Sequence, residues 1–232
     1  MPHEKPNPLA VLKLPEVQCF LAAGALSTLA NRGVVVVIGF QIYQLTKSAL
    51  ALGWLGLVEA IPAISLSLFG GYVADHFNRR TILLNTRAVS IICAVLLAII
   101  SNNSEPNVLA LYSVIFLAGI ARGFADPAAT AFEAQVVPRE LTVNASSWIG
   151  STWLSCSIIG PVLAGFACAW WGPVVTYLVV SFLFCLSWIC LLGIKPKPQP
   201  DAGKSESIFH SISLGLKFVF SEQILVGAMP NP

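Results

Sequence analysis

Long apolar runs separated by short polar segments constrain this chain more strongly than any other feature. They cover approximately residues 17–45, 50–74, 81–100, 108–134, 143–170 and 174–194. Each run is near the roughly 20 residues that a helix needs to cross a hydrocarbon core of about 30 Å. Only 10% of the 232 residues are charged and 56% are hydrophobic, which is far from the composition of a soluble domain. We therefore expect an all-α membrane protein with six transmembrane helices.

Basic residues gather on one side of the expected membrane. With the N-terminus inside, the cytoplasmic segments hold Lys5, Lys13, Arg79, Arg80, Arg139, Lys195, Lys197, Lys204 and Lys217, and the outer loops hold Lys47. Short loops rich in Lys and Arg stay in the cytoplasm. We expect a multi-pass protein of the plasma membrane with a cytoplasmic N-terminus, whose first helix is too long for a cleaved signal peptide. The net charge of +2 then reflects topology and not nucleic-acid binding.

The chain divides into four expected parts. Residues 1–16 form a cytoplasmic N-terminal segment and residues 17–194 the transmembrane bundle. Residues 195–207, rich in proline, serine and charge, are typical of a solvated linker. Residues 208–232 begin with apolar residues at helical spacing among serines and a lysine, which predicts an amphipathic helix on the membrane surface.

No sequence pattern for a cofactor, a metal ion or enzymatic catalysis is apparent. The six cysteines fall inside apolar runs without CxxC spacing, and the three histidines are scattered, so we expect buried free cysteines and no metal site. A glycine-rich phosphate-binding loop is also missing from the sequence. We expect no enzymatic activity, no cofactor and no ATP-driven step within this chain.

The polar segment at residues 71–80, GYVADHFNRR, carries the first resemblance to a known family. Its order of Gly71, Asp75, Arg79 and Arg80 resembles the loop after the second helix of major facilitator superfamily transporters. His76 stands where that family usually has arginine, and Asn78 where it usually has glycine. Residues 160–165, GPVLAG, resemble a motif of the superfamily's exporters, and residues 43–48, 138–141 and 213–219 are similar to its enterobactin-exporter and macrolide-efflux branch.

The resemblance implies half of a twelve-helix fold. Six helices would form one bundle, and the linker and surface helix would lead to a second bundle that this chain lacks, or whose place a second copy takes. Residues 30–33 (ANRG) also resemble residues 120–123 (IARG), and Trp54 and Pro62 resemble Trp153 and Pro161. This pattern favours two inverted three-helix repeats.

The resemblance also implies a conformational latch at the cytoplasmic face. Asp75 would face a helix end of the other half, and Arg79 would reach Glu133 or Asp126 on the fourth helix. Alternatively, Arg79 and Arg80 act only as positively charged anchors. In the exporter-like segment, Gly160, Pro161 and Gly165 would allow close helix packing and bending, either for export or as ordinary small-residue packing.

Four charged residues at membrane depth are candidates for a substrate or proton pathway: Arg32, Glu59, Arg122 and Asp126. Charges in the hydrocarbon region are costly and mark functional sites by default. The resemblance implies that both arginines face a central cavity and bind an anionic or polar cargo. The alternative is local neutralisation, in which Arg122 pairs with Asp126 four residues away and Glu59 pairs with Arg32.

The resemblance thus implies a secondary active transporter working by alternating access, whereas composition and topology by themselves predict only a six-helix membrane domain. It would be an antiporter that exports a small organic molecule, drug-like or siderophore-like, in exchange for protons, with Glu59 the favoured proton carrier. Its partners would be the lipid bilayer, the substrate and protons, with no nucleic acid. The alternative is a non-transporting six-helix membrane protein, either an assembly or regulatory partner or a truncated inactive half.

Overall fold

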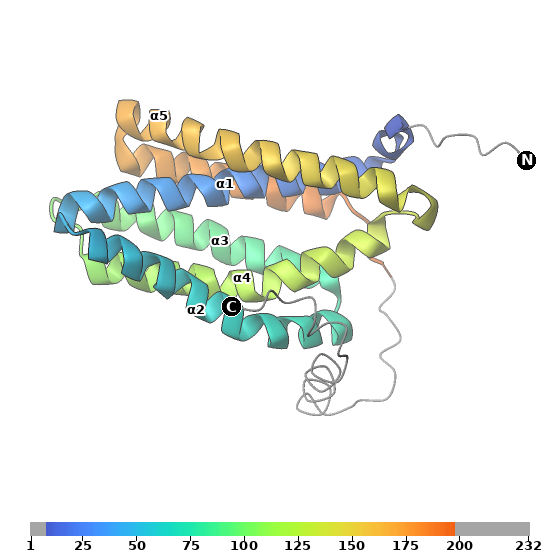
Figure 1. Cartoon of the computed structure of the whole chain (residues 1–232), viewed down its shortest axis with the longest axis horizontal. Coiled ribbons are helices and arrows are strands. Elements are labelled where there is room, and N and C mark those ends of the chain that lie inside the picture. Colours follow the sequence, from blue (N-terminus) through green and yellow to red (C-terminus); the bar gives the residue numbers. More distant parts are fainter. Residues whose placement is uncertain (1–7, 198–232) are drawn as a thin grey trace, which may run out of the picture.

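The described part of the chain, residues 8–197, is helical throughout in the computed structural model (Figure 1). Its elements are η1 (Pro8–Lys13), α1 (Pro15–Thr46), α2 (Ala49–His76), α3 (Arg79–Ser101), α4 (Val108–Val136), η2 (Arg139–Leu141) and α5 (Thr142–Leu192). Five of the helices are long and apolar enough to cross a membrane. The expected surface helix at 208–232 and most of the linker at 195–207 lie outside the described residues.

Helix α5 differs from the expectation of two separate spans. It runs for 51 residues as one element and contains a single non-helical residue, Gly172, with φ 77° and ψ 173°. Pro173 follows and cannot donate a backbone hydrogen bond across the break. The two limbs, residues 142–171 and 173–192, therefore run back along each other (Figure 1). The described residues therefore contain five long helices where the sequence predicts six, because the turn between the last two expected spans takes only one residue.

The other helix ends lie within a few residues of the expected positions, and side chains cap the starts of α3 and α4. The Asn78 side chain accepts a hydrogen bond from the Thr81 amide at 3.3 Å and starts α3. Asn107 starts α4 in the same way, accepting from the Leu109 amide at 2.9 Å. Asparagine is among the preferred residues at this position, since it satisfies amides that the first turn leaves free.

The helices lie side by side along the length of the bundle. Helix α1 packs mainly against α5, α2 packs against α4, and α3 lies against both α4 and α5. The α1–α2 loop, the α3–α4 loop and the break at Gly172 meet at one end, which we call the loop end (Figure 1). The opposite end, called the terminal end, carries η1, the turn between α2 and α3, and the end of α5 (Figure 1).

Small residues let two helix pairs approach closely. A Cβ atom at Gly70 would lie 2.3 Å from the Gly123 carbonyl oxygen, so α2 and α4 touch through their backbones. A Cβ atom at Gly160 would lie 3.1 Å from the Leu29 carbonyl oxygen, which brings α5 against α1. Gly165 has nothing within 4 Å, so only Gly160 of the two exporter-motif glycines serves the expected close packing.

Two apolar clusters fill the bundle toward its two ends. Phe132, Leu83 and Leu191 belong to the cluster of the terminal end, and Ile42 and Tyr177 to that of the loop end. All six cysteines are free; Cys93, Cys156 and Cys168 are buried, whereas Cys19, Cys185 and Cys190 are only partly buried. The expectation that every cysteine is buried is therefore wrong for the latter three.

Candidate functional site: a charged cavity between the helices

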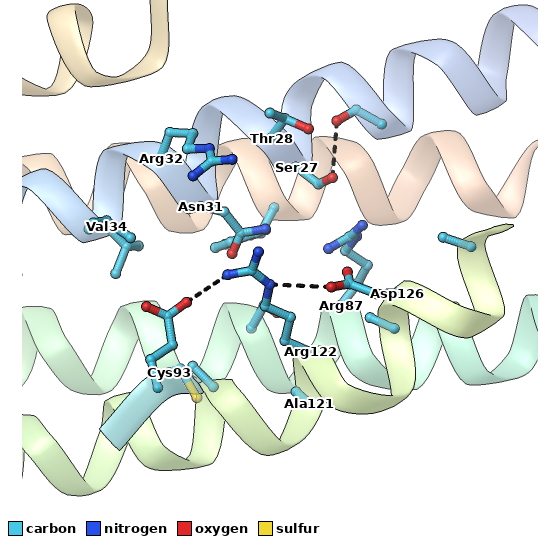
Figure 2. A pocket seen from close by; sticks show the side chains of 18 of the residues that line it. Ser27, Thr28, Asn31, Arg32, Val34, Arg87, Cys93, Ala121, Arg122 and Asp126 are labelled. Atoms are coloured by element: carbon cyan, nitrogen blue, oxygen red, sulfur yellow. Dashed lines mark hydrogen bonds and ion pairs between the residues drawn. The ribbon is translucent and has the colours of Figure 1, made fainter. Parts of the chain in front are cut away.

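A cavity of about 720 Å³ lies among α1, α2, α3, α4 and both limbs of α5. All four charged candidates from the sequence line it: Arg32, Glu59, Arg122 and Asp126. A space of this size matches the 300–1,000 Å³ usual for small-molecule sites. The structure therefore gathers four charges from α1, α2 and α4 around one space (Figure 2).

Arg122 is the centre of the charged cluster. It stands at the midpoint of α4 and reaches into the cavity between two carboxylates (Figure 2). Its Nη1 donates to Glu59 Oε1 at 2.9 Å, and its Nε donates to Asp126 Oδ2 at 3.4 Å. The expected pairing of Arg122 with Asp126 is present. The expected partner of Glu59 is wrong, because Glu59 bonds to Arg122 and not to Arg32.

The two carboxylates of the cluster differ in exposure. The side chain of Glu59 is 27% exposed, whereas that of Asp126 is 71% exposed. The shorter and less exposed hydrogen bond to Glu59 is the stronger of the two, since water competes less with charge-assisted bonds in sheltered positions. Glu59 thus fixes Arg122, and Asp126 makes the looser contact.

Arg32 occupies the opposite wall. Its guanidinium lies 5.7 Å from the centre of the Trp153 ring, on the first limb of α5. This is the distance of a cation–π contact. Among residues 8–197, no carboxylate lies within ion-pair distance of Arg32. Asn31, Ser27 and Thr28 of the same helix add polar groups to this wall (Figure 2).

A fifth charged residue on the cavity, Arg87 of α3, is not among those expected from the sequence. It carries the same signal as the other four, a charged side chain inside an apolar run, and so the sequence contained the information needed to find it. Its Nε is sealed from solvent and has no hydrogen-bond partner in the described part of the chain. Asp126 is the charged group that acts on it electrostatically.

All of the expected latch residues except Glu133 lie outside the cavity, at the terminal end. Arg79 does reach α4, but through the backbone: its Nη1 donates to the Ala131 carbonyl at 2.9 Å. The expectation that Arg79 pairs with a carboxylate on α4 is therefore wrong. Arg79 is held instead by this bond and by its Nε, which donates to the Ala74 carbonyl at 3.0 Å. Glu133 lines the cavity instead and accepts from Ser146 at 3.5 Å.

Asp75 and Gly71 have few contacts with the rest of the described bundle. The Asp75 side chain is 70% exposed and has only a weak contact to Arg79, at 3.5 Å. A Cβ atom at Gly71 would meet nothing within 4 Å. Arg80 is more than an anchor, because its Nε donates to the Leu191 carbonyl at 3.2 Å and its Nη2 to the Leu192 carbonyl at 3.0 Å. Arg80 thus satisfies carbonyls that the last turn of α5 leaves free.

Comparisons with known proteins find membrane transporters. The profile described as Major Facilitator Superfamily matches residues 20–231. The chain is 30% identical over 151 residues to the multi-drug resistance efflux pump PmrA of Streptococcus pneumoniae, covering 63% of this chain and 36% of the pump. It is 25% identical over 226 residues to the enterobactin exporter EntS of Shigella flexneri, covering 95% of this chain and 54% of the exporter.

Solved structures of similar shape are also transporters. A POT family transporter in complex with 5-aminolevulinic acid has a TM-score of 0.64 at 15% identity, covering 90% of this chain and 46% of that one. The POT family transporter PepTSo has a TM-score of 0.63 at 14% identity, and the match covers 90% of this chain and 47% of that transporter. At these identities the likeness shows the fold alone. The chain spans about half the length of these proteins or less.

Proposed function

The chain belongs to the major facilitator superfamily, and from that premise we propose that it is one half of a proton-coupled antiporter that exports a small organic molecule. The observation that carries the proposal is Arg122, held at 2.9 Å from Glu59 and 3.4 Å from Asp126 beside a cavity of about 720 Å³. A charged cluster at the middle of a membrane helix is costly and is retained for function. The efflux pump and exporter among its relatives support export as the direction.

Proton coupling in this proposal acts through Glu59. Arginine stays charged at any physiological pH, so the carboxylates are the groups of the cluster that can take up a proton. Ionised Glu59 holds Arg122 at 2.9 Å through Oε1 and keeps lone pairs that can accept a hydrogen bond from a substrate. A proton on Glu59 occupies this acceptor and weakens the pair with Arg122. Proton and substrate therefore compete for Glu59, and each lowers the affinity for the other, which is the linkage that exchange in opposite directions requires.

Alternating access requires a second bundle, which would come from a further segment of the protein or from a second copy. In this proposal the two limbs of α5 count as two spans, so that six spans form two inverted three-helix repeats. The terminal end faces the cytoplasm of a cell whose plasma membrane holds the protein. The exposed Asp75 and the open surface at Gly71 would contact the second bundle and close the cytoplasmic side.

The test uses everted membrane vesicles from cells that produce the protein, with an imposed pH gradient reported by a fluorescent dye. Candidate drugs and catechol-type compounds are added in turn. A transported compound releases the gradient faster than in vesicles without the protein, and a proton uncoupler removes the difference. If none of the drugs and none of the catechol-type compounds speeds the release of the pH gradient, the transport proposal fails.

Replacing Glu59 with glutamine separates proton coupling from transport. Glu59→Gln keeps the hydrogen-bonding shape and removes the titratable group, so we expect pH-dependent flux to be abolished while substrate binding stays. Glu140→Gln is the matched control, because Glu140 is an exposed carboxylate on η2 away from the cavity. Flux with the wild-type pH dependence in Glu59→Gln would remove Glu59 from the mechanism without touching the proposal of transport.

A further inference from the structure

The cavity holds cations that its own carboxylates do not neutralise. Both carboxylates near the middle of the cavity, Glu59 and Asp126, bond to Arg122. Arg32 has a ring contact only, and Arg87 has no hydrogen bond or ion pair within residues 8–197. The remaining acidic residue on the cavity, Glu133, lies 11 positions beyond Arg122 on α4, or roughly 16 Å along the helix axis.

Arg87 differs from Arg32 in having a buried donor without an acceptor in the described part of the chain. Its Nε is buried without an acceptor, which is a costly state for a guanidinium donor. Its remaining nitrogens point into the cavity beside Asp126, whose carboxylate is already held by Arg122 (Figure 2). A planar fork of donors without a partner fits a carboxylate, sulfonate or phenolate group of a ligand.

The cavity is apolar toward the loop end. Ile38, Leu52, Leu55, Leu97 and Ile115 line that part, on four different helices. The charged residues lie nearer the middle of the helices. A ligand that matches both parts carries one acid group and an apolar body.

We propose that this cavity binds an amphiphilic organic anion, with Arg87 receiving its acid group and the apolar body lying toward Ile38 and Leu97. This binding proposal names the substrate class of the transport function proposed above. It rests on that function only for the step of transport. Binding itself needs no gradient and no second bundle. Arg32, on the opposite wall, adds a second positive charge to the field that the anion meets.

The test compares two probes of nearly the same shape, 2-naphthoate and its neutral analogue 2-naphthamide. The full chain is placed in phosphatidylcholine nanodiscs, so that anionic lipid does not compete, and binding is measured by titration calorimetry against empty nanodiscs. We expect naphthoate to bind about tenfold or more tightly than naphthamide, as one charge-assisted hydrogen-bond pair provides. Equal affinity for the two probes, or no binding of naphthoate, overturns the proposal.

Two variants with opposite effects identify Arg87 as the anchor. Arg87→Gln should weaken naphthoate binding about tenfold and leave naphthamide unchanged, whereas Asp126→Asn should tighten naphthoate binding because it removes the negative charge beside Arg87. An unchanged affinity for naphthamide shows that the cavity of the variant is still folded. Arg139→Gln, an exposed arginine of η2, is the control and should change neither probe.

The outcomes separate this proposal from the proposed function. If Arg87→Gln leaves naphthoate affinity unchanged, or weakens both probes equally, or if Asp126→Asn fails to tighten naphthoate, Arg87 is not the anchor, whatever the vesicle assay shows. If naphthoate binding behaves as expected but no compound releases the pH gradient in vesicles, the site stands and the proposed transport fails.

Discussion

At the scale of single residues, neighbouring glycines of α2 have different roles. Gly71 opens the family-like segment, yet a Cβ atom there would meet nothing within 4 Å. Gly70, just before it, touches the backbone of α4, where a Cβ atom would lie 2.3 Å from the Gly123 carbonyl oxygen. The tertiary packing thus depends on the residue outside the recognisable pattern.

This difference predicts opposite outcomes for two adjacent substitutions. Gly70→Ala forces α2 and α4 apart and should lower the free energy of unfolding by about 1–3 kcal/mol, as overpacking does. Gly71→Ala should be neutral or stabilising by up to about 1 kcal/mol, since alanine favours helix more than glycine. Thermal unfolding of the purified protein in one detergent compares the two. An equal loss from both would contradict the close contact at Gly70.

The charged residues show how far residue-level reasoning reaches. Charge inside an apolar run singled out Arg32, Glu59, Arg122 and Asp126, which all line one cavity. It did not predict the partners, because Glu59 on α2 meets Arg122 on α4 through a packing of helices that no local pattern specifies. Arg87 could have been found by the same rule, but its lack of a partner is visible only in three dimensions.

At the scale of elements, α5 depends on one backbone conformation. Gly172 has φ 77° and ψ 173°, a region that is essentially restricted to glycine. The pair Gly172–Pro173 was enough to predict a turn near this position, since glycine and proline end helices. The sequence could not show that the turn takes a single residue, because the packing of both limbs along α1 and α3 determines how tight it is.

Substituting the turn glycine should therefore be costly. Gly172→Ala forces an L residue into the strained region and should lower the free energy of unfolding by about 1–3 kcal/mol. Gly165→Ala is the matched control in the same helix, because a Cβ atom there meets nothing within 4 Å and should change stability by less than about 1 kcal/mol. Thermal unfolding in detergent measures both. If Gly172→Ala unfolds at the wild-type temperature, the positive φ is not required.

At the scale of the whole molecule, the terminal end carries an exposed carboxylate. Asp75 is 70% exposed there, while Arg79 and Arg80 are fixed by carbonyls of the same bundle. The two arginines thus stabilise this bundle, and Asp75 is the member of the segment that is free to contact another. This division supports Asp75 as the moving part of the proposed latch.

The latch predicts a kinetic defect without a folding defect. If the proposed latch is present, Asp75→Asn removes its charge-assisted contact with a second bundle, so we expect turnover in the vesicle assay to fall about tenfold or more. The amount of protein in the membrane should stay the same by immunoblot. Glu105→Gln, an exposed carboxylate in the α3–α4 loop at the other end, serves as the control. Wild-type turnover in Asp75→Asn would rule out the latch.

The sequence by itself determined that the chain is helical, where its apolar spans lie, and which charged residues lie inside those spans. Those conclusions follow from local chemistry, because lipid permits only self-satisfied backbones and makes every charge costly. Only the tertiary structure decided that Glu59 binds Arg122, that Arg79 bonds to a carbonyl, and that Arg87 lacks a partner. Pairing depends on which helix faces meet, and contacts as close as Gly70 against Gly123 determine those faces.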